Sequence, residues 1–197
     1  MIGMGTQTDR GSVISLIMPL LLTLLVFSAS AEASSLHQER RVMAGLNLFP
    51  NIVSVDLDLL DKRSKKGFVL LLLANEYDQH EAERLAARLR GKVKSIKRTE
   101  VEVQVASNFT ELGKGNISPS AIFLTEQLSD NAFQQVLKFA IERHILIFSP
   151  FSGDVERGAT TGLSIGSRIQ PYYNVETVKR SNIRFHQLFL KVAKGYE

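Results

Sequence analysis

The strongest catalytic motif in the chain lies at residues 162–166, which read Gly-Leu-Ser-Ile-Gly and so form a G-x-S-x-G pattern. In lipases and esterases this pattern holds the nucleophilic serine on a sharp turn between a strand and a helix. Glu176 and His186 follow Ser164, so the order serine, acid, histidine is present as well. These residue types raise the hypothesis of a serine hydrolase.

The surroundings of Ser164 argue against that hypothesis. The motif needs a helix directly after the serine, whereas the residues after Gly166 form a second strand-like run that contains Pro171. Two short runs joined by Gly166-Ser167 instead predict a β-hairpin with a two-residue type II′ turn. Only 21 residues separate Ser164 from His186, too few for the additional strands of a hydrolase sheet. We therefore expect no enzyme active site in this segment.

His186 stands at the start of a stretch with helical spacing. The apolar residues that recur on one side of this stretch predict a buried stripe. They are Phe185, Leu188, Phe189, Val192 and Ala193. A helix at this position accounts for His186 without a catalytic role.

Other chemistries leave no pattern in the sequence. The four histidines are far apart and cysteine is absent, so no metal site is expected. No glycine motif for phosphate binding is present, and no cofactor is expected. The basic clusters at 62–66, 92–98 and 179–180 contain no interleaved aromatic residues, which argues against nucleic acid as a partner.

Residues 1–31 have the composition of a signal peptide. A single positive charge, Arg10, precedes an uncharged apolar run over 13–27, and the small residues that follow fit cleavage after Ala31 or Ala33. The run is short for a membrane-spanning helix, although an uncleaved N-terminal anchor is the alternative. Either reading predicts an exported, periplasmic protein.

The absence of cysteine limits how an exported domain can be stabilised and controlled. It excludes a lipid anchor on cysteine, disulfide bonds and thiol redox switching. Stability must then come from a hydrophobic core, and residues 36–197 are numerous enough to form one. We expect a single domain over this range.

The start of that domain is predicted to be helical. Its apolar spacing begins at Leu36, and Phe49-Pro50 is expected to break or kink the helix. Residues 52–60 fit strand and helix equally well, so no assignment follows for them.

From residue 67 onward, strand and helix patterns alternate. Buried strands are predicted at 68–74 and 121–124, where apolar residues are continuous. An alternating strand is predicted at 101–105, and 144–148 is a further strand candidate. One predicted helix is capped by Asp78 and stopped at Gly91, and another begins at Ser129 or Asp130. This order is typical of an α/β fold. We expect a single compact domain with a mostly parallel sheet flanked by helices, a C-terminal β-hairpin and two C-terminal helices.

Ligands of open parallel sheets bind beyond the carboxyl ends of the strands. At those ends the predicted strands place Asn75, Ser107, Thr125 and the loop that begins at Ser149. These residues, together with Phe151, are our candidates for contact with a partner or ligand. Phe151 has an equally good structural explanation, because an aromatic side chain next to a strand end often covers the core.

Residues 158–194 resemble the closing segment of the YfiR/HmsC-like periplasmic proteins. That segment runs as a glycine-containing strand, a turn, a strand with an arginine, an asparagine and two helices. Arg168 and Asn174 occupy the arginine and asparagine positions here. Residues 46–56 and 67–75 resemble the family's first helix and first strand. The chain lacks the cysteines of some members and the family's Trp-Pro.

The resemblance implies a compact α/β fold and a non-enzymatic regulator in the bacterial periplasm. Members of the family restrain an inner-membrane diguanylate cyclase, and so control cyclic-di-GMP and biofilm, or accompany sensor histidine kinases. We therefore expect an inner-membrane signalling protein as the partner. The alternative is a small-solute-binding protein of an uptake or sensing system, and a homodimer is left open.

Overall fold

The computed structural model describes residues 36–107, 109 and 118–197. The chain divides into two units, Met1–Arg40 and Arg41–Glu197. In the first unit the described residues, 36–40, are helical. The predicted signal peptide lies outside the described residues. The α/β domain is formed within the second unit.

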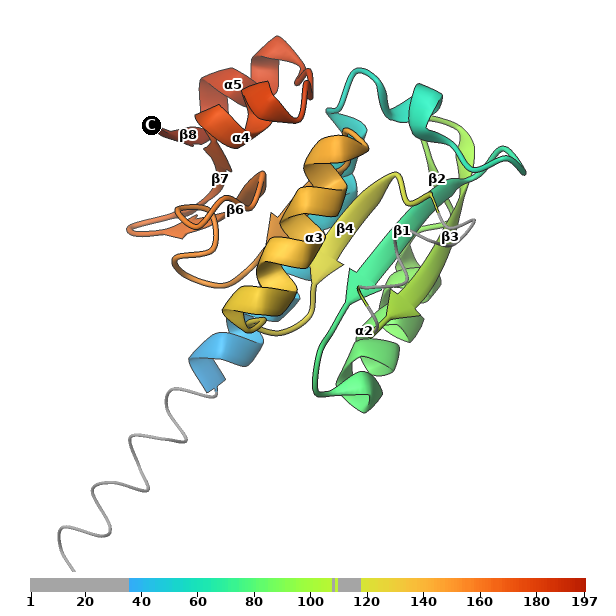
Figure 1. Ribbon diagram of the computed structural model, residues 1–197, viewed down its shortest axis with the longest axis horizontal. Helices are drawn as coiled ribbons and strands as arrows, with labels where there is room; N and C mark the ends of the chain where they lie inside the picture. The colour runs from blue at the N-terminus through green and yellow to red at the C-terminus, as the bar shows by residue number, and fades with distance from the viewer. Residues whose placement is uncertain (1–35, 108, 110–117) are drawn as a thin grey trace, which may run out of the picture. The chain divides into compact units, whose positions relative to one another are not determined.

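The domain is built on an eight-stranded sheet in the order β2-β3-β1-β4-β5-β6-β7-β8 (Figure 1). The β2–β3 and β6–β7 pairs are antiparallel and the remaining neighbours are parallel. The strands are β1 (Val69–Ala74), β2 (Ser95–Ile96), β3 (Thr99–Ala106), β4 (Ala121–Leu124), β5 (Leu146–Ser149), β6 (Thr161–Ile165), β7 (Ile169–Asn174) and β8 (Lys194–Tyr196).

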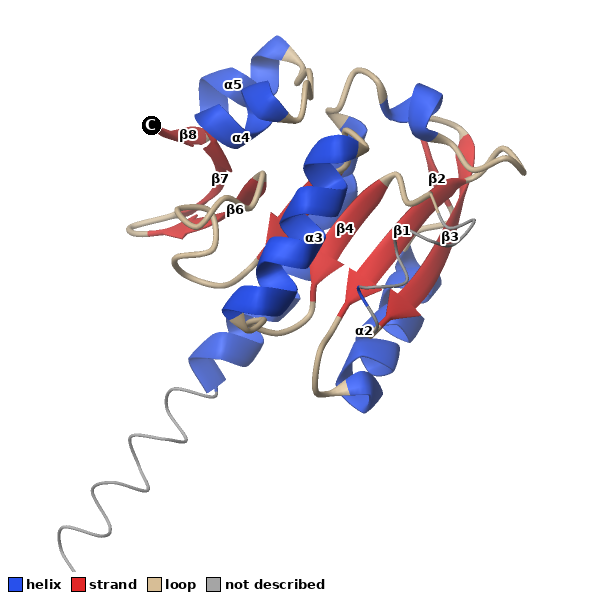
Figure 2. Ribbon diagram, in the orientation of Figure 1, coloured by secondary structure: helices blue, strands red, loops and turns tan. Residues whose placement is uncertain are grey.

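Helices cover both faces of the central strands, with α3 in front of the sheet and α2 behind it (Figure 2). The described helices of this unit are 41–54, the 3-10 helix η1 (Leu59–Lys62), α2 (Gln79–Lys92), α3 (Asp130–Glu142), α4 (Val175–Arg180) and α5 (Gln187–Val192). The predicted α/β class, its mostly parallel sheet, its hairpin and its two C-terminal helices are confirmed.

The caps of the two long helices form as their sequences predict. The Asp78 side chain accepts a hydrogen bond from the N–H of Glu81 at the start of α2, and Ser129 accepts from Ala132 at the start of α3. The predicted stop at Gly91 is wrong, because α2 continues to Lys92 and the Val93 N–H still donates to the Leu89 carbonyl.

The helix does not break at Phe49-Pro50, since it runs through Pro50 to residue 54. Buried residues lie on both sides of this proline, Leu46 and Phe49 before it and Val53 after it. Packing of this buried stripe supports a helix that the proline alone would disfavour. The segment that fitted both strand and helix divides into the end of this helix and η1.

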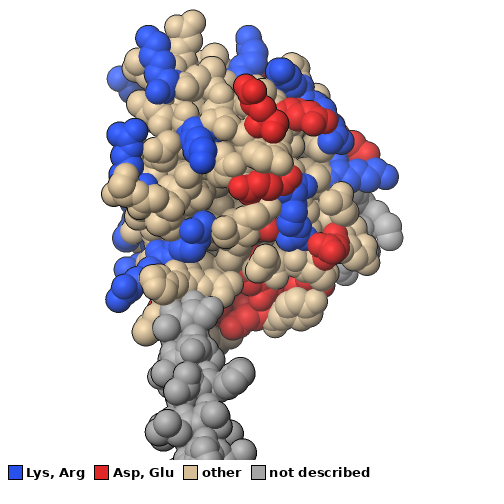
Figure 3. Space-filling model, turned by 90° about the vertical axis from the view of Figure 1, so that its left-hand side faces the viewer, with Lys and Arg blue, Asp and Glu red and all other residues tan. Residues whose placement is uncertain are grey.

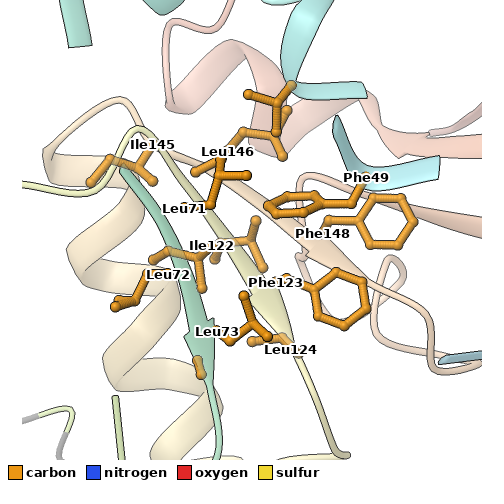
Figure 4. Close-up of a cluster of buried hydrophobic side chains, with 14 of the residues drawn as sticks. Phe49, Leu71, Leu72, Leu73, Ile122, Phe123, Leu124, Ile145, Leu146 and Phe148 are labelled. Carbon is orange, nitrogen blue, oxygen red and sulfur yellow. The ribbon is translucent and has the colours of Figure 1, made fainter. Parts of the chain in front are cut away.

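Core side chains come from the central strands and from the helices packed on them, and an aromatic cluster joins the helix 41–54 to the sheet. Phe49 meets Phe123 of β4 and Phe148 of β5 at ring-centroid distances of 5.3 and 5.8 Å, and those two rings stack at 5.6 Å (Figure 4). Each buried ring removes a large apolar area from water. All six residues of β1 and all four of β4 are buried, as their uninterrupted apolar sequences predict.

The G-x-S-x-G segment forms the predicted β-hairpin, and Ser164 lies within β6. The predicted two-residue type II′ turn is wrong. Ile165 pairs with Ile169, so the loop has three residues, and the Gly166 N–H donates to the Arg168 carbonyl. Gly166 does not have the positive φ that a type II′ turn needs at its first position.

The buried stripe predicted around His186 forms only in part. Phe185 and Phe189 are buried, whereas Leu188 and Val192 are 65% and 62% exposed. The reason is the length of α5, which spans six residues before the chain turns into β8. Phe189 alone therefore fixes this helix, through contacts with Phe185 and Tyr173.

Candidate functional site

The sheet aligns the predicted site residues at one edge. Ala74 at the end of β1 is paired with Ala106 on one side and Leu124 on the other, and Phe123 is paired with Phe148. The residues at or just after these strand ends therefore follow one another across the sheet. They are Ser107, Asn75, Thr125 and Ser149, in the order β3, β1, β4 and β5.

Asn75 is the unusual member of this row. It is 1% exposed, and among the described residues neither its side-chain nitrogen nor its side-chain oxygen has a hydrogen-bond partner. A buried amide without hydrogen-bond partners costs free energy of folding. Stability alone therefore does not explain an asparagine at this position. Asn75 directly follows β1, and the strand order reverses direction between β1 and β4, which is the usual ligand position in this kind of sheet.

The loops after β1 and β4 are tied to each other by two carboxylates. Glu126 accepts hydrogen bonds from the N–H groups of Glu76 and Tyr77, and Glu76 accepts from the N–H and the hydroxyl of Ser129, both at 2.8 Å. Burial opposes ionisation of Glu76, but the hydrogen bonds from Ser129 prevail and lower its pKa. Both carboxylates are thus engaged in holding the loops.

Thr125 and Ser149 have structural roles at this edge. The Thr125 hydroxyl donates to the Ala74 carbonyl, and the Ser149 hydroxyl donates to the Asp154 carboxylate at 2.7 Å while it accepts from the Phe151 N–H. Ser149 is also the last residue of β5 rather than the first of a loop. Ser107 is exposed.

Phe151 is 5% exposed, so the structural explanation for this residue holds. The loop that carries it is fixed by the fully buried Asp154. Burial is the main cause of a raised pKa at Asp154, although its hydrogen bonds from Ser149 and Arg157 act in the opposite direction. Arg157 extends this anchor to α3 by stacking 4.2 Å from the ring centroid of Phe133. These contacts hold the loop after β5 in place, and the loop forms one wall of a cleft.

That wall borders a cleft of about 160 Å³, which we call the hairpin cleft. The β6–β7 hairpin, the start of the helix 41–54 and β8 form its other sides. Its lining residues are Arg41, Phe151, Ser152, Gly153, Val155, Glu156, Leu163, Ser164, Ile165, Tyr172 and Lys194. The cleft lies at the carboxyl ends of β5 and β6, on the edge that also carries Asn75 and Thr125.

Three charged groups line the hairpin cleft. Arg41 is held by main-chain oxygens, donating from Nε to the Pro150 carbonyl at 2.8 Å and from Nη2 to the Leu163 carbonyl at 3.3 Å. Burial lowers its pKa, and the nearby Glu156 carboxylate partly offsets this effect. Because arginine is not deprotonated in proteins near neutral pH, Arg41 contributes a positive charge to the cleft.

The other two charged groups of the cleft, Glu156 and Lys194, both lie near Tyr172. Burial is the main cause that raises the pKa of Tyr172 to about 12, and the nearby Glu156 carboxylate acts in the same direction. The Lys194 ammonium lies 5.4 Å from the centroid of the Tyr172 ring and forms no salt bridge with a described residue. The cleft thus presents two cations and one carboxylate within a small volume.

The hydrolase triad is not assembled. Ser164 lines the hairpin cleft, but His186 caps α5 by accepting a hydrogen bond from the Leu188 N–H, and Glu176 lies in the first turn of α4. Neither His186 nor Glu176 lines the cleft. The expectation that Ser164 is a strand position is confirmed.

A larger hollow of about 310 Å³ lies at the opposite edge of the sheet, before β4 and β5. It includes Asp58 and Lys62, which are already paired, Lys62 with Asp56 at 2.6 Å and Asp58 with Arg184. These pairs brace η1 and the segment before α5. We therefore assign this hollow to structure rather than to ligand binding.

The described residues contain neither a metal-ligand cluster nor a membrane-spanning helix. No group of three or more potential ligands that could hold a metal ion occurs in them. In the same part of the chain, no helix is both long enough and apolar enough to cross a membrane.

Sequence comparison finds no matching family model and no matching curated protein. Among solved structures, an ABC domain in complex with L-Trp from Streptococcus pneumoniae is similar at 11% identity and a TM-score of 0.44, covering 73% of this chain. A conserved domain protein from Vibrio cholerae is similar at 13% identity and a TM-score of 0.47, covering 70%.

A ligand-free, open substrate-binding protein with adhesive properties from Clostridium difficile is similar at 15% identity and a TM-score of 0.47, covering 72% of this chain. The matched part spans 58–60% of the length of these three structures.

Proposed function

We propose that this chain is an exported small-solute-binding protein and that its solute occupies the hairpin cleft without undergoing a chemical step. The observation that carries the proposal is the charge pattern of the cleft. Two cations, Arg41 and Lys194, and one carboxylate, Glu156, line a hollow at the strand ends where ligands of parallel sheets bind.

The cationic side chains of the cleft are already oriented in the protein without solute. The two carbonyl oxygens that bind Arg41 fix its guanidinium, so little side-chain freedom is lost on binding. Lys194 lacks a salt-bridge partner among the described residues and can pair with an incoming anion. An ammonium over an aromatic ring, as Lys194 lies over Tyr172, is also partly oriented.

The size and charge of the cleft suggest the class of solute. The cleft volume of about 160 Å³ is smaller than the roughly 300–1,000 Å³ of pockets for drug-sized ligands, so its solute should be small. A carboxylate would pair with Arg41 and Lys194, and a hydrogen-bond donor or ammonium would reach Glu156. A small carboxylic acid or amino acid therefore fits better than a sugar or a nucleotide.

Thermal unfolding with a defined solute panel tests this proposal. The panel contains acetate, succinate, glycine and L-alanine, with glucose as a neutral control. A solute that binds the folded state raises the melting temperature in proportion to its occupancy. We expect a rise with at least one carboxylate and none with glucose.

Single-charge variants connect the effect to the cleft. Lys194→Gln and Glu156→Gln should each weaken the effective solute at least about tenfold, because each removes a charged hydrogen bond. Lys138→Gln on α3 is the matched control, since Lys138 is exposed and outside the cleft. No response to any carboxylate, or equal responses in Lys194→Gln and the control, would contradict the proposal.

A second candidate is the periplasmic regulator that the family resemblance implies. The observation that favours it is that β6 and β7, which carry the resemblance, also form the hairpin side of the cleft. An inner-membrane signalling protein would then bind the domain differently with and without solute in the cleft. Pull-down from membranes, with and without the effective solute, tests this. If one signalling protein is enriched and its enrichment depends on the solute, the regulator proposal is supported. If no protein is enriched, the regulator proposal fails and only solute binding remains.

A further inference from the structure

The three charged groups of the hairpin cleft are not paired with one another. Glu156 forms no salt bridge with a described residue, and the same holds for Arg41 and Lys194. The Glu156 carboxylate is nevertheless close enough to act on the pKa values of both Arg41 and Tyr172, and Lys194 lies over the Tyr172 ring. Opposite charges therefore line one small cleft without direct contact.

Both cations of the cleft still have hydrogen-bond donors to offer. A guanidinium has five N–H donors, and the carbonyls of Pro150 and Leu163 accept from only two of those of Arg41, one on Nε and one on Nη2. Neither of these acceptors has a negative charge, so the charge of Arg41 is not neutralised by them. The Lys194 ammonium contacts the face of Tyr172 and has no carboxylate partner among the described residues.

The anionic group of the cleft is attached to a fixed stretch of main chain. The Val155 carbonyl accepts a hydrogen bond from the Asn174 side chain at 2.8 Å, and Arg157 pairs with Asp154 at 2.8 Å. These contacts anchor the residues directly before and after Glu156, whose own side chain is exposed. The Glu156 carboxylate is therefore available to an incoming cation.

The surface around the cleft has no uniform charge. Figure 3 looks onto the side of the molecule that carries the β6–β7 hairpin at the left of Figure 1. Lys and Arg occur in both halves of that side, and Asp and Glu lie among them. Exposed charges are screened over about 8 Å at physiological salt. The three charges inside the cleft therefore determine which small solute it prefers.

The number and sign of these charges narrow the class of solute. A monocarboxylate would leave one cation and Glu156 without a partner, and a dicarboxylate would bring no cation to Glu156. A neutral amino acid would leave one of the two cations unpaired. An acidic amino acid has two carboxylates and one ammonium, so it provides one partner of opposite sign for each charge of the cleft.

We propose that the solute of the hairpin cleft is a small acidic amino acid. One of its carboxylates pairs with Arg41, the other pairs with Lys194, and its ammonium pairs with Glu156. The cleft volume of about 160 Å³ favours a short solute such as L-aspartate. This inference rests on the proposed function, because it specifies the solute of the same cleft.

Calorimetric titration of the full chain with L-aspartate and three close analogues tests the inference. Succinate has both carboxylates but no ammonium, whereas L-asparagine and L-isoasparagine each replace one carboxylate by a neutral amide. We expect L-aspartate to bind at least about tenfold more tightly than each analogue, because each analogue lacks one charged hydrogen bond.

Variants of the cleft assign each preference to a residue. Glu156→Gln should remove the preference for L-aspartate over succinate and retain the preference over the amides. Lys194→Gln should remove the preference over one of the two amides and retain the preference over succinate. Glu142→Gln and Lys138→Gln are the matched controls, because both residues are exposed on α3 and lie outside the cleft. The controls should change none of the preferences.

The comparison of analogues within one variant separates recognition from a general loss of folding or binding. Glu156→Asp, which keeps the charge, should retain part of the preference over succinate. Succinate or both amides binding as tightly as L-aspartate to the wild type would overturn this inference and leave solute binding in place. A Glu156→Gln variant that weakens all four solutes equally would also overturn it. No binding of any carboxylate would contradict the proposed function itself.

Discussion

Asn75 and Asn174 are both buried asparagines at strand ends, and they differ in one respect. Asn174 caps α4 by accepting from the Thr177 N–H at 2.8 Å and donates to the Val155 carbonyl at 2.8 Å, whereas the Asn75 amide has no partner among the described residues. The hydrogen-bonded amide stabilises the fold, and the unpartnered one costs free energy.

Replacement by leucine should therefore change the free energy of unfolding differently at the two positions. Asn75→Leu should leave the free energy of unfolding unchanged or raise it by about 1 kcal/mol, because an unsatisfied polar group is removed. Asn174→Leu should lower it by about 2 kcal/mol, because a cap and a buried hydrogen bond are lost. Urea unfolding measures both. Equal destabilisation would mean that Asn75 is satisfied in solution, for example by an internal water.

Tyr172 gives a pH-dependent prediction. Burial and the nearby Glu156 carboxylate raise its pKa to about 12 in the folded protein, above the value of about 10 for an unfolded chain. The protonated form is therefore favoured by folding. This contribution to stability is complete below about pH 10 and is lost as the pH rises through about 12.

Titration of tyrosinate absorbance tests the prediction. The chain has four tyrosines, and one of them should ionise near pH 12 in the wild type. Tyr172→Phe should remove that late step, and Glu156→Gln should move it to lower pH. A late step that persists in Tyr172→Phe would assign it to another tyrosine.

At the scale of elements, the two glycines of the G-x-S-x-G segment have different roles. A Cβ on Gly162 would lie 2.6 Å from the Ser149 carbonyl oxygen and 2.7 Å from a methyl group of Val155, whereas a Cβ on Gly166 would meet nothing within 4 Å. Gly162 thus allows β6 to approach β5 and the wall of the hairpin cleft, and Gly166 lies at the hairpin tip.

Alanine scanning of these two positions distinguishes the roles. Gly162→Ala should destabilise the fold by about 1–3 kcal/mol, since the clash involves backbone that cannot move aside. Gly166→Ala, the matched control, should change stability by less than about 0.5 kcal/mol. Thermal or urea unfolding provides the measurement. Comparable effects at both positions would contradict the close-packing explanation for Gly162.

The elements also show where sequence patterns suffice. Strands β1 and β4 follow from uninterrupted apolar runs, and the caps of α2 and α3 follow from Asp78 and Ser129, which are local signals. Strands β2 and β8 were not predicted. Pro50 and the α5 stripe could not be predicted, because the outcome depends on contacts with residues distant in the chain. Packing of Phe49 against β4 and β5 favours the helix through Pro50, and the short span of α5 leaves Leu188 and Val192 without neighbours.

At the scale of the molecule, the parallel sheet made part of the candidate site predictable. The alternation of strands and helices was enough to place Asn75, Ser107, Thr125 and Ser149 at one edge. The hairpin cleft was not predictable. Arg41, Glu156 and Lys194 come from segments more than a hundred residues apart at the extremes, and no local spacing connects them. Whether any of these residues contacts a ligand stays a prediction.

Nuclear magnetic resonance titration tests the central claim most directly. The solute of the panel that raises the melting temperature most is added to isotope-labelled protein, and the backbone amide shifts are followed. We predict saturable shifts concentrated at residues 151–156, 163–165, 172 and 194, and their loss in Lys194→Gln. Shifts confined to the loops after β1 and β4, or no saturable shift with any carboxylate of the panel, would contradict solute binding in the hairpin cleft.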